Sequence, residues 1–268
     1  GLLYERRLGA HKLPDGVIIC ACGNKPEHSP SAFELPSQVA NRVWHCDWEF
    51  DLAAWCEGML SGWPKLDLRP LPPDWRKVWI PRVTPLVVGF DRSVPGFIND
   101  MPKDRAKAGF AWPSPRTWHM ARDLLAAGMA MGMDIDARHV LIAGAVGNSA
   151  AVAFRQFAEK QDLPDPEDIL KDPMNFAITD DKHRLHVILG AVAQAVISNH
   201  TLERWQAAIV YMARVLKEAQ CDDISAFYYM TLSKRCPVPT DPDDIPDDVR
   251  EFLGIMRESG VLKRPTTS

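Results

Sequence analysis

The chain has 268 residues, of which 46% are hydrophobic and 25% are charged, an ordinary globular composition with room for two or three small cores. Its formal net charge is -4, so it has no bulk attraction to nucleic acid or anionic lipid, and no apolar stretch approaches the ~20 residues of a transmembrane helix. Six scattered cysteines in a chain of this size do not indicate disulfides. We therefore expect a cytoplasmic protein that binds neither membranes nor nucleic acid.

Residues 2–24 are predicted to form a hairpin that leads into a buried strand. The turn is expected at Pro14-Asp15-Gly16, and the following run is apolar from Val17 onward and ends in the amide of Asn24. A run that is apolar on both faces is typical of a parallel sheet covered by helices, and such sheets bind ligands beyond the carboxyl ends of their strands. This placement makes Asn24 a candidate site residue.

A second strand is predicted after a short helix. The helix starts at Pro36 and stops near Arg42, and residues 43–50 then alternate between apolar and polar side chains, as in a half-buried strand. We expect this strand to lie parallel to and beside residues 17–23. Arg42 would then lie at a helix end next to the sheet edge.

From residue 51 onward, helices are predicted on both sides of a proline-rich stretch. Asp51 is expected to cap a helix over residues 51–63, whereas the prolines in residues 64–81 predict an ordered insertion without a long helix. Beyond Asp134, apolar residues recur at helical spacing, which predicts helical structure in residues 137–160, 184–198, 201–219 and 249–258.

Another helix start stands out at Ser114-Pro115, because serine is a favoured cap and proline is favoured at the first helical position. Arg116 therefore lies in the first turn of this helix. Free N–H groups and a partial positive charge at a helix start, together with a guanidinium, are suited to binding a nucleotide phosphate.

Several motifs together resemble the distal part of a MoxR-type AAA+ ATPase. In chain order they are Glu5-Arg6-Arg7-Leu8-Gly9, Leu13-Pro14-Asp15-Gly16, Ala21-Cys22-Gly23-Asn24, Leu35-Pro36, Ala40-Asn41-Arg42 and Pro113-Ser114-Pro115-Arg116-Thr117-Trp118. The likeness in order and spacing covers residues 2–130. The helical region from residue 137 is similar, less specifically, to the extension of one bacterial and phage branch of that family.

The resemblance implies a role for each candidate site residue. Asn24 would be sensor 1, Arg42 the arginine finger that points into a neighbouring subunit, and Arg116 sensor 2 on the lid. Hydrolysis of a γ-phosphate needs an oriented water and positive charge on the equatorial oxygens, which these side chains could supply.

The resemblance also implies a fold and a domain order. We expect an α/β remnant of a P-loop NTPase core in residues 1–50, an all-α lid in residues 51–136 and a helical C-terminal extension in residues 137–236. Residues 237–268 would form a linker, a short helix and a tail. The intact protein would form a homo-oligomeric, hexameric ring, with a von Willebrand A-type protein as a partner.

The chain departs from the family in its phosphate-binding motifs. It contains no Gly-x-x-x-x-Gly-Lys-Ser/Thr sequence and no apolar strand that ends in Asp-Glu. We expect these motifs to precede Gly1 in a longer protein, and the segment alone to be inactive. The cofactors would be ATP and Mg²⁺, with their main ligands outside this segment.

Plainer interpretations remain open. Asn24 could be a turn residue, Arg42 a partner of a helix C-terminus, and Arg116 a surface residue. The whole chain could be a non-catalytic helical adaptor that keeps an AAA-like lid for protein contacts. A zinc site is a further alternative, with candidate ligands at Cys20, Cys22, His28, His45 and Cys46.

Overall fold

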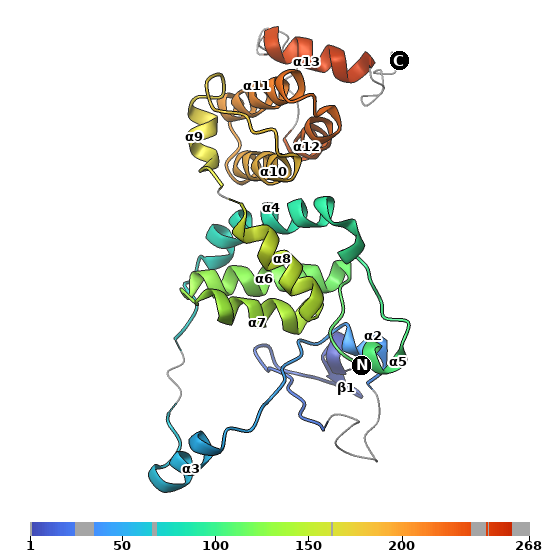
Figure 1. Ribbon diagram of the computed structural model, residues 1–268, viewed down its shortest axis with the longest axis vertical. Helices are drawn as coiled ribbons and strands as arrows, with labels where there is room; N and C mark the ends of the chain where they lie inside the picture. The colour runs from blue at the N-terminus through green and yellow to red at the C-terminus, as the bar shows by residue number, and fades with distance from the viewer. Residues whose placement is uncertain are drawn as a thin grey trace.

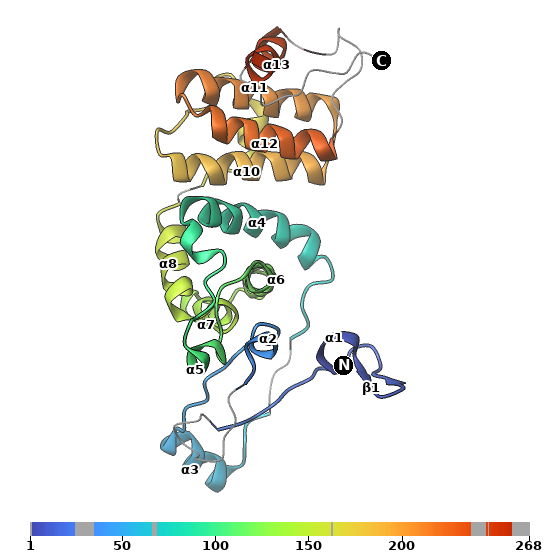
Figure 2. The ribbon, with the colours of Figure 1, turned by 90° about the vertical axis from the view of Figure 1, so that its right-hand side faces the viewer.

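Helices build most of the ordered chain in the computed structural model, which describes residues 2–24, 35–65, 69–161, 163–236, 245 and 247–258. Two helical bundles are stacked along the long axis of the molecule, and a separate short helix stands away from them at one end (Figures 1 and 2). Among the described residues, no helix is both long enough and apolar enough to cross a membrane.

The N-terminal hairpin forms and closes at a turn that precedes the predicted one. Its elements are α1 (Leu2–Glu5), β1 (Arg7–Leu8) and β2 (His11–Lys12), and the two strands pair antiparallel. The hairpin reverses at Gly9, whose φ of 61° suits glycine. The predicted turn at Pro14-Asp15-Gly16 also forms, with φ of 86° at Gly16 and a hydrogen bond from the Val17 N–H to the Pro14 carbonyl at 3.5 Å. The Arg6 guanidinium donates to the carbonyls of Pro14 and Val17 at 3.2 and 2.7 Å, which folds the following segment back on the hairpin.

The two predicted parallel strands do not form, so this part of the prediction is wrong. Residues 17–24 and 43–50 have no regular secondary structure, and most of their side chains are exposed. Ile18 is 83% exposed and Trp48 is 93% exposed. A strand is stable only when a neighbour satisfies its backbone N–H and C=O groups, and no segment in the described part of the chain pairs with either one.

The short helix after Pro36 is confirmed as α2 (Ser37–Ala40), and the helix after Asp51 is confirmed as α3 (Leu52–Ser61). The Asp51 carboxylate accepts a hydrogen bond from the Ala54 N–H at 3.1 Å and thereby caps α3.

A long helix crosses part of the stretch predicted to be an insertion. This helix, α4 (Trp75–Ser93), contains Pro81 and Pro85, although each proline removes one backbone hydrogen bond and costs about 3 kcal/mol in a helix interior. Burial of Val83 and Phe90, both 0% exposed, offsets this cost. The prediction that prolines exclude a long helix here is therefore wrong.

The first bundle contains α4, η2 (Pro95–Phe97), α6 (Pro115–Ala130), α7 (Ile135–Val146) and α8 (Asn148–Glu159), and α5 (Arg105–Ala108) lies beside α2. Its centre is aromatic: the Phe90 ring lies 5.2 Å from the ring of Trp118 and 5.4 Å from that of Phe154. The predicted helical region 137–160 is divided at Gly147, where φ is 84° and a Cβ would approach the Ala111 carbonyl oxygen to 2.7 Å. One core includes Trp118 as well as Ile142 and Phe154, so packing continues across residue 137, where the domain boundary was predicted.

The second bundle contains α9 (Pro166–Lys171), α10 (Lys182–Ser198), α11 (Leu202–Glu218), α12 (Asp222–Arg235) and α13 (Asp247–Glu258). These helices confirm the helical periods predicted for residues 184–198, 201–219 and 249–258. Trp205, Tyr211 and Phe252 are fully buried among them.

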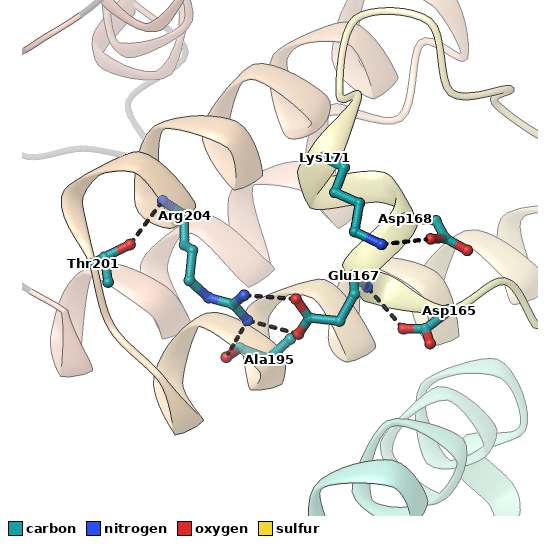
Figure 3. A network of polar contacts seen from close by, with 7 residues as sticks. All are labelled: Asp165, Glu167, Asp168, Lys171, Ala195, Thr201 and Arg204. Carbon is teal, nitrogen blue, oxygen red and sulfur yellow. Dashed lines mark hydrogen bonds and ion pairs between the residues drawn. The ribbon is translucent and has the colours of Figure 1, made fainter.

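A bidentate ion pair fastens α9 to α11. Figure 3 shows the Arg204 guanidinium donating to both carboxylate oxygens of Glu167, at 2.6 and 2.8 Å, and to the Ala195 carbonyl at 3.0 Å. The pair lowers the pKa of Glu167, chiefly through the hydrogen bond from Arg204. The network joins α9, α10 and α11 through one guanidinium group, because Glu167, Ala195 and Arg204 lie on these three helices.

The two bundles meet where α4 packs against α10. Gly89 on α4 lies so close to Val187 that a Cβ would overlap the Val187 Cγ2 atom. On α10, a Cβ at Gly190 would lie 3.3 Å from both Pro85 and the Tyr228 hydroxyl. Glycine on each helix therefore allows the close approach.

Candidate functional site

The start of α6 is built around a buried hydrogen-bond network. Ser114 Oγ accepts from the Thr117 N–H at 3.2 Å, and the Ser114 N–H donates to Thr117 Oγ1 at 2.8 Å, which completes a capping box. Ser114 Oγ also donates to Asn41 Oδ1 at 2.8 Å, and Asn41 Nδ2 donates to the Trp112 carbonyl at 3.2 Å. Asn41, only 4% exposed, thus ties the end of α2 to the start of α6.

The same N-terminal segment is fastened to α7. The Trp44 indole N–H donates to the Leu141 carbonyl at 2.9 Å, and the His45 N–H donates to the Gly144 carbonyl at 2.8 Å. A Cβ at Gly144 would meet both Trp44 and the His45 carbonyl, so only glycine allows this contact. Residues 41–45 are therefore held against two helices of the first bundle.

The hydrogen bonds of Asn41 bring the segment that contains Arg42 close to the start of the helix that contains Arg116. Arg42 follows Asn41, and Arg116 lies two residues after Ser114; both arginines are exposed. Asn24 is exposed too, at the end of the irregular segment 17–24, and it takes no part in the network. The structure thus joins the surroundings of Arg42 and Arg116 but does not bring Asn24 to them.

The start of α6 offers fewer free N–H groups to a phosphate than the sequence suggested. The capping box already uses the Thr117 N–H, and Pro115 has no N–H to offer. Binding of an anion would therefore depend on the exposed Arg116 guanidinium more than on the helix end itself. Guanidinium groups can bind phosphate oxygens, but the chain contains no Gly-x-x-x-x-Gly-Lys-Ser/Thr sequence, whose amides would cradle a nucleotide's phosphates.

A pocket of about 270 Å³ lies between the loop that precedes α6 and the junction of α7 and α8. Its lining includes Asp100, Lys107, Phe110, Trp112 and Asn148. One amine and one carboxylate face it, so its charge favours neither anions nor cations. Sequence reasoning missed this pocket and Asn41; the glycine at 147 within an alanine-rich stretch was the available signal for the break that shapes it.

A second group of titratable side chains lies at the contact between the bundles. His186 is 9% exposed, and burial, followed by the charge of Arg92, lowers its pKa to about 4. Burial also raises the pKa of Asp91 to about 7 and raises that of the Tyr228 hydroxyl. The His186 and Tyr228 rings are 5.9 Å apart. His186 and Tyr228 lie in the contact between α10 and α12 and are buried there, so we assign them to packing.

Within the described residues, no group of three or more His, Cys, Asp or Glu side chains is arranged to hold a metal ion. His28, one of the candidate zinc ligands, lies outside the described residues.

Comparison of the chain with protein-family models, with curated proteins and with solved structures gives no match.

Proposed function

We propose that this chain is the sensor and lid portion of a cytoplasmic MoxR-type AAA+ ATPase, which couples ATP hydrolysis in a hexameric ring to the remodelling of a client. The observation that carries the proposal is the Asn41 network, because it fastens the residue before Arg42 to the start of the helix that bears Arg116. Two arginines held near one helix start are suited to a single nucleotide site or to adjoining ones.

In this proposal each residue acts on the nucleotide and not through covalent chemistry. Arg42 contacts the γ-phosphate bound by the neighbouring subunit, Arg116 contacts the γ-phosphate from the lid, and Asn24 orients the attacking water. ATP and Mg²⁺ are held mainly by a phosphate-binding loop and an acidic strand end that the 268 residues do not contain.

The proposal requires a sheet that the described residues do not form. The exposed apolar side chains of residues 17–24 support it, because a strand supplied by other polypeptide would cover them and satisfy their backbone groups. Asn24 would reach the nucleotide only when that sheet is complete.

The test is Arg42→Ala in an ATPase that joins these residues to a phosphate-binding loop. An arginine finger acts on the transition state, so nucleotide affinity should change little while turnover falls roughly a thousandfold or more. Arg235→Ala is the matched control, since Arg235 is equally exposed but lies at the far end of α12. Turnover within about twofold of the unmodified enzyme would show that Arg42 is structural.

Mixing subunits separates action on the neighbour from action on the subunit's own site. A subunit with Arg42→Ala and an intact phosphate loop should regain turnover beside a subunit with the opposite defect. A subunit with Asn24→Ala should not, because sensor 1 serves its own nucleotide. If Arg42→Ala is not rescued by mixing, the finger does not act across the interface.

The second candidate function is a non-catalytic helical adaptor, and one observation favours it: the structure leaves Asn24 apart from the two arginines. Calorimetry with ATP on the 268-residue chain should show no tight binding on either hypothesis. A micromolar dissociation constant would contradict the expectation that the main ATP ligands lie elsewhere.

A further inference from the structure

Residues 47–63 form an apolar arm that stands away from both helical bundles in two perpendicular views (Figures 1 and 2). Trp48 is 93% exposed and Leu60 is 88% exposed. The large apolar side chains that the arm exposes are Trp48, Phe50, Leu52, Trp55, Met59, Leu60 and Trp63. Such a concentration on one short element marks a surface that another molecule covers.

The arm has an internal structure of its own. Asp51 caps α3, the Trp63 ring packs over Gly58 so closely that a Cβ there would lie 2.6 Å from it, and the Phe50 and Trp55 rings are 6.4 Å apart. Leu52, Trp55 and Met59 recur at helical spacing, so they share one face of α3.

The exposed area is sufficient for a stable interface. Seven large apolar side chains at these exposures present on the order of 1,000 Å², since an aromatic side chain alone carries about 150–250 Å². A standard protein interface buries about 800 Å² on each partner. The arm can therefore supply one side of a specific contact.

The charge of the arm restricts what can cover it. Residues 47–63 contain four acidic residues and no lysine or arginine. Anionic lipid and nucleic acid would be repelled, because both present dense negative charge. The partner must combine apolar side chains with positive charge.

The same chain carries such a surface around α5, which we name the basic loop and define as residues 101–110. Three basic side chains are exposed there, those of Lys103, Arg105 and Lys107. None of them takes part in an ion pair with another described residue. Met101 is 57% exposed and Phe110 is 41% exposed beside them. The pocket of about 270 Å³ opens next to Lys107 and Phe110 and offers space for an apolar side chain.

We propose that the apolar arm of one copy docks on the basic loop of a second copy. The two surfaces differ, so the contact is heterologous and repeats from copy to copy, as closed rings require. The inference rests on the proposed function for the expectation of a ring, but the contact itself requires no nucleotide.

Sedimentation velocity on the 268-residue chain, without nucleotide, tests the contact. We expect association that increases with protein concentration and falls with added salt, because the interface includes opposite charges. Glu49→Lys with Glu57→Lys on the arm should abolish it, as should Lys103→Glu, Arg105→Glu and Lys107→Glu on the basic loop. Lys160→Glu with Arg235→Glu, at exposed positions elsewhere, is the control and should leave association unchanged.

Mixing the two charge-reversed variants gives the decisive result. The variant changed on the loop keeps a native arm, and the variant changed on the arm keeps a native basic loop. An equimolar mixture can therefore form the native contact and should associate, although neither variant does alone. Trp48→Ser with Leu60→Ser removes apolar contacts at the most exposed arm positions and should also give monomers with unchanged circular dichroism.

A wild-type chain that stays monomeric up to about 200 µM, a concentration at which a contact with a micromolar dissociation constant would be nearly saturated, would overturn the proposal. Association that survives reversal of the basic loop would also overturn it, since the arms would then contact one another. Both results would leave the roles of Arg42 and Arg116 to be decided by turnover alone, so the two proposals fail separately.

Discussion

Asn41 joins two distant parts of the chain with both ends of one amide, and each end meets a buried partner. Asn41→Ala would leave the Trp112 carbonyl and the Ser114 hydroxyl without this partner, so we expect a loss of about 1–3 kcal/mol in the free energy of unfolding. Denaturant titration measures the loss. Asn199→Ala, at an exposed helix end, is the control. A loss no larger than that of the control would contradict the role given to Asn41.

His186 should make the protein less stable in acid. Its folded pKa of about 4 lies below the ordinary 6.5, so the unfolded chain binds the proton first and stability is lost as pH falls from about 6.5 to about 4. The groups around it are Arg92 on α4, Asp223 and Tyr228 on α12, and His183 on α10. His186→Gln should remove at most about 3–4 kcal/mol of this acid-side loss, at about 1.4 kcal/mol per pKa unit.

Thermal unfolding of wild type and His186→Gln between pH 4 and pH 7 measures the difference. His200→Gln, at an exposed position after α10, is the control. Parallel stability curves for wild type and His186→Gln across this range would show that burial does not perturb His186.

Single residues were predictable from sequence where the signal was local. Ser114 and Asp51 are caps because serine and aspartate at those places bond to N–H groups three residues away, and the structure confirms both. Asn41 and Gly144 could not be identified in this way, because their partners lie dozens of residues away along the chain. Arg116 was placed correctly in the first turn of α6, whereas its proposed contact with phosphate stays a prediction.

The contact between α4 and α10 depends on glycine at position 89. Gly89→Ala should lower the free energy of unfolding by about 1–3 kcal/mol, because the new methyl group overlaps Val187, whose branched side chain has little freedom to move. Combining it with Val187→Ala should give a double variant that is more stable than the sum of the two single losses predicts.

Gly254→Ala on α13 is the matched control, since nothing lies within 4 Å of a Cβ there. It should be neutral or stabilising by up to about 1 kcal/mol, because alanine favours helices. Additive losses in the Gly89 and Val187 cycle would mean that the two helices are free to separate slightly at this point.

Most helices were predictable, whereas the two parallel strands predicted in residues 17–23 and 43–50 did not form, for a physical reason. The periods of α6, α10 and α11 lie within single stretches of sequence, and their backbone groups are satisfied within each helix. The apolar run of residues 17–24 has the composition of a strand but cannot become one without a hydrogen-bonded neighbour. In α4 the sequence rule excluded a helix that does form, because the burial of its apolar side chains outweighs the cost of two prolines.

The molecule as a whole should unfold in a single step despite its two cores. The helix α4 contributes Val83 and Phe90 to the first core and also packs along α10 of the second. Unfolding of either bundle would expose the closely packed contact between α4 and α10, so calorimetry should give one transition whose calorimetric and van't Hoff enthalpies agree. Phe90→Ala should lower the melting temperature of the whole transition. Two resolved peaks, with only one moved by Phe90→Ala, would contradict this expectation.

The shared helix also has a mechanical consequence. The 19 residues of α4 span roughly 28 Å at 1.5 Å per residue, and the helix lies along the boundary between the two bundles. The glycines at positions 89 and 190 leave no layer of flexible side chains to absorb a displacement at that boundary. A rotation of α6 would therefore be passed through α4 to α10, and the second bundle would rotate with it as one body. The displacement of its atoms would increase with their distance from α4.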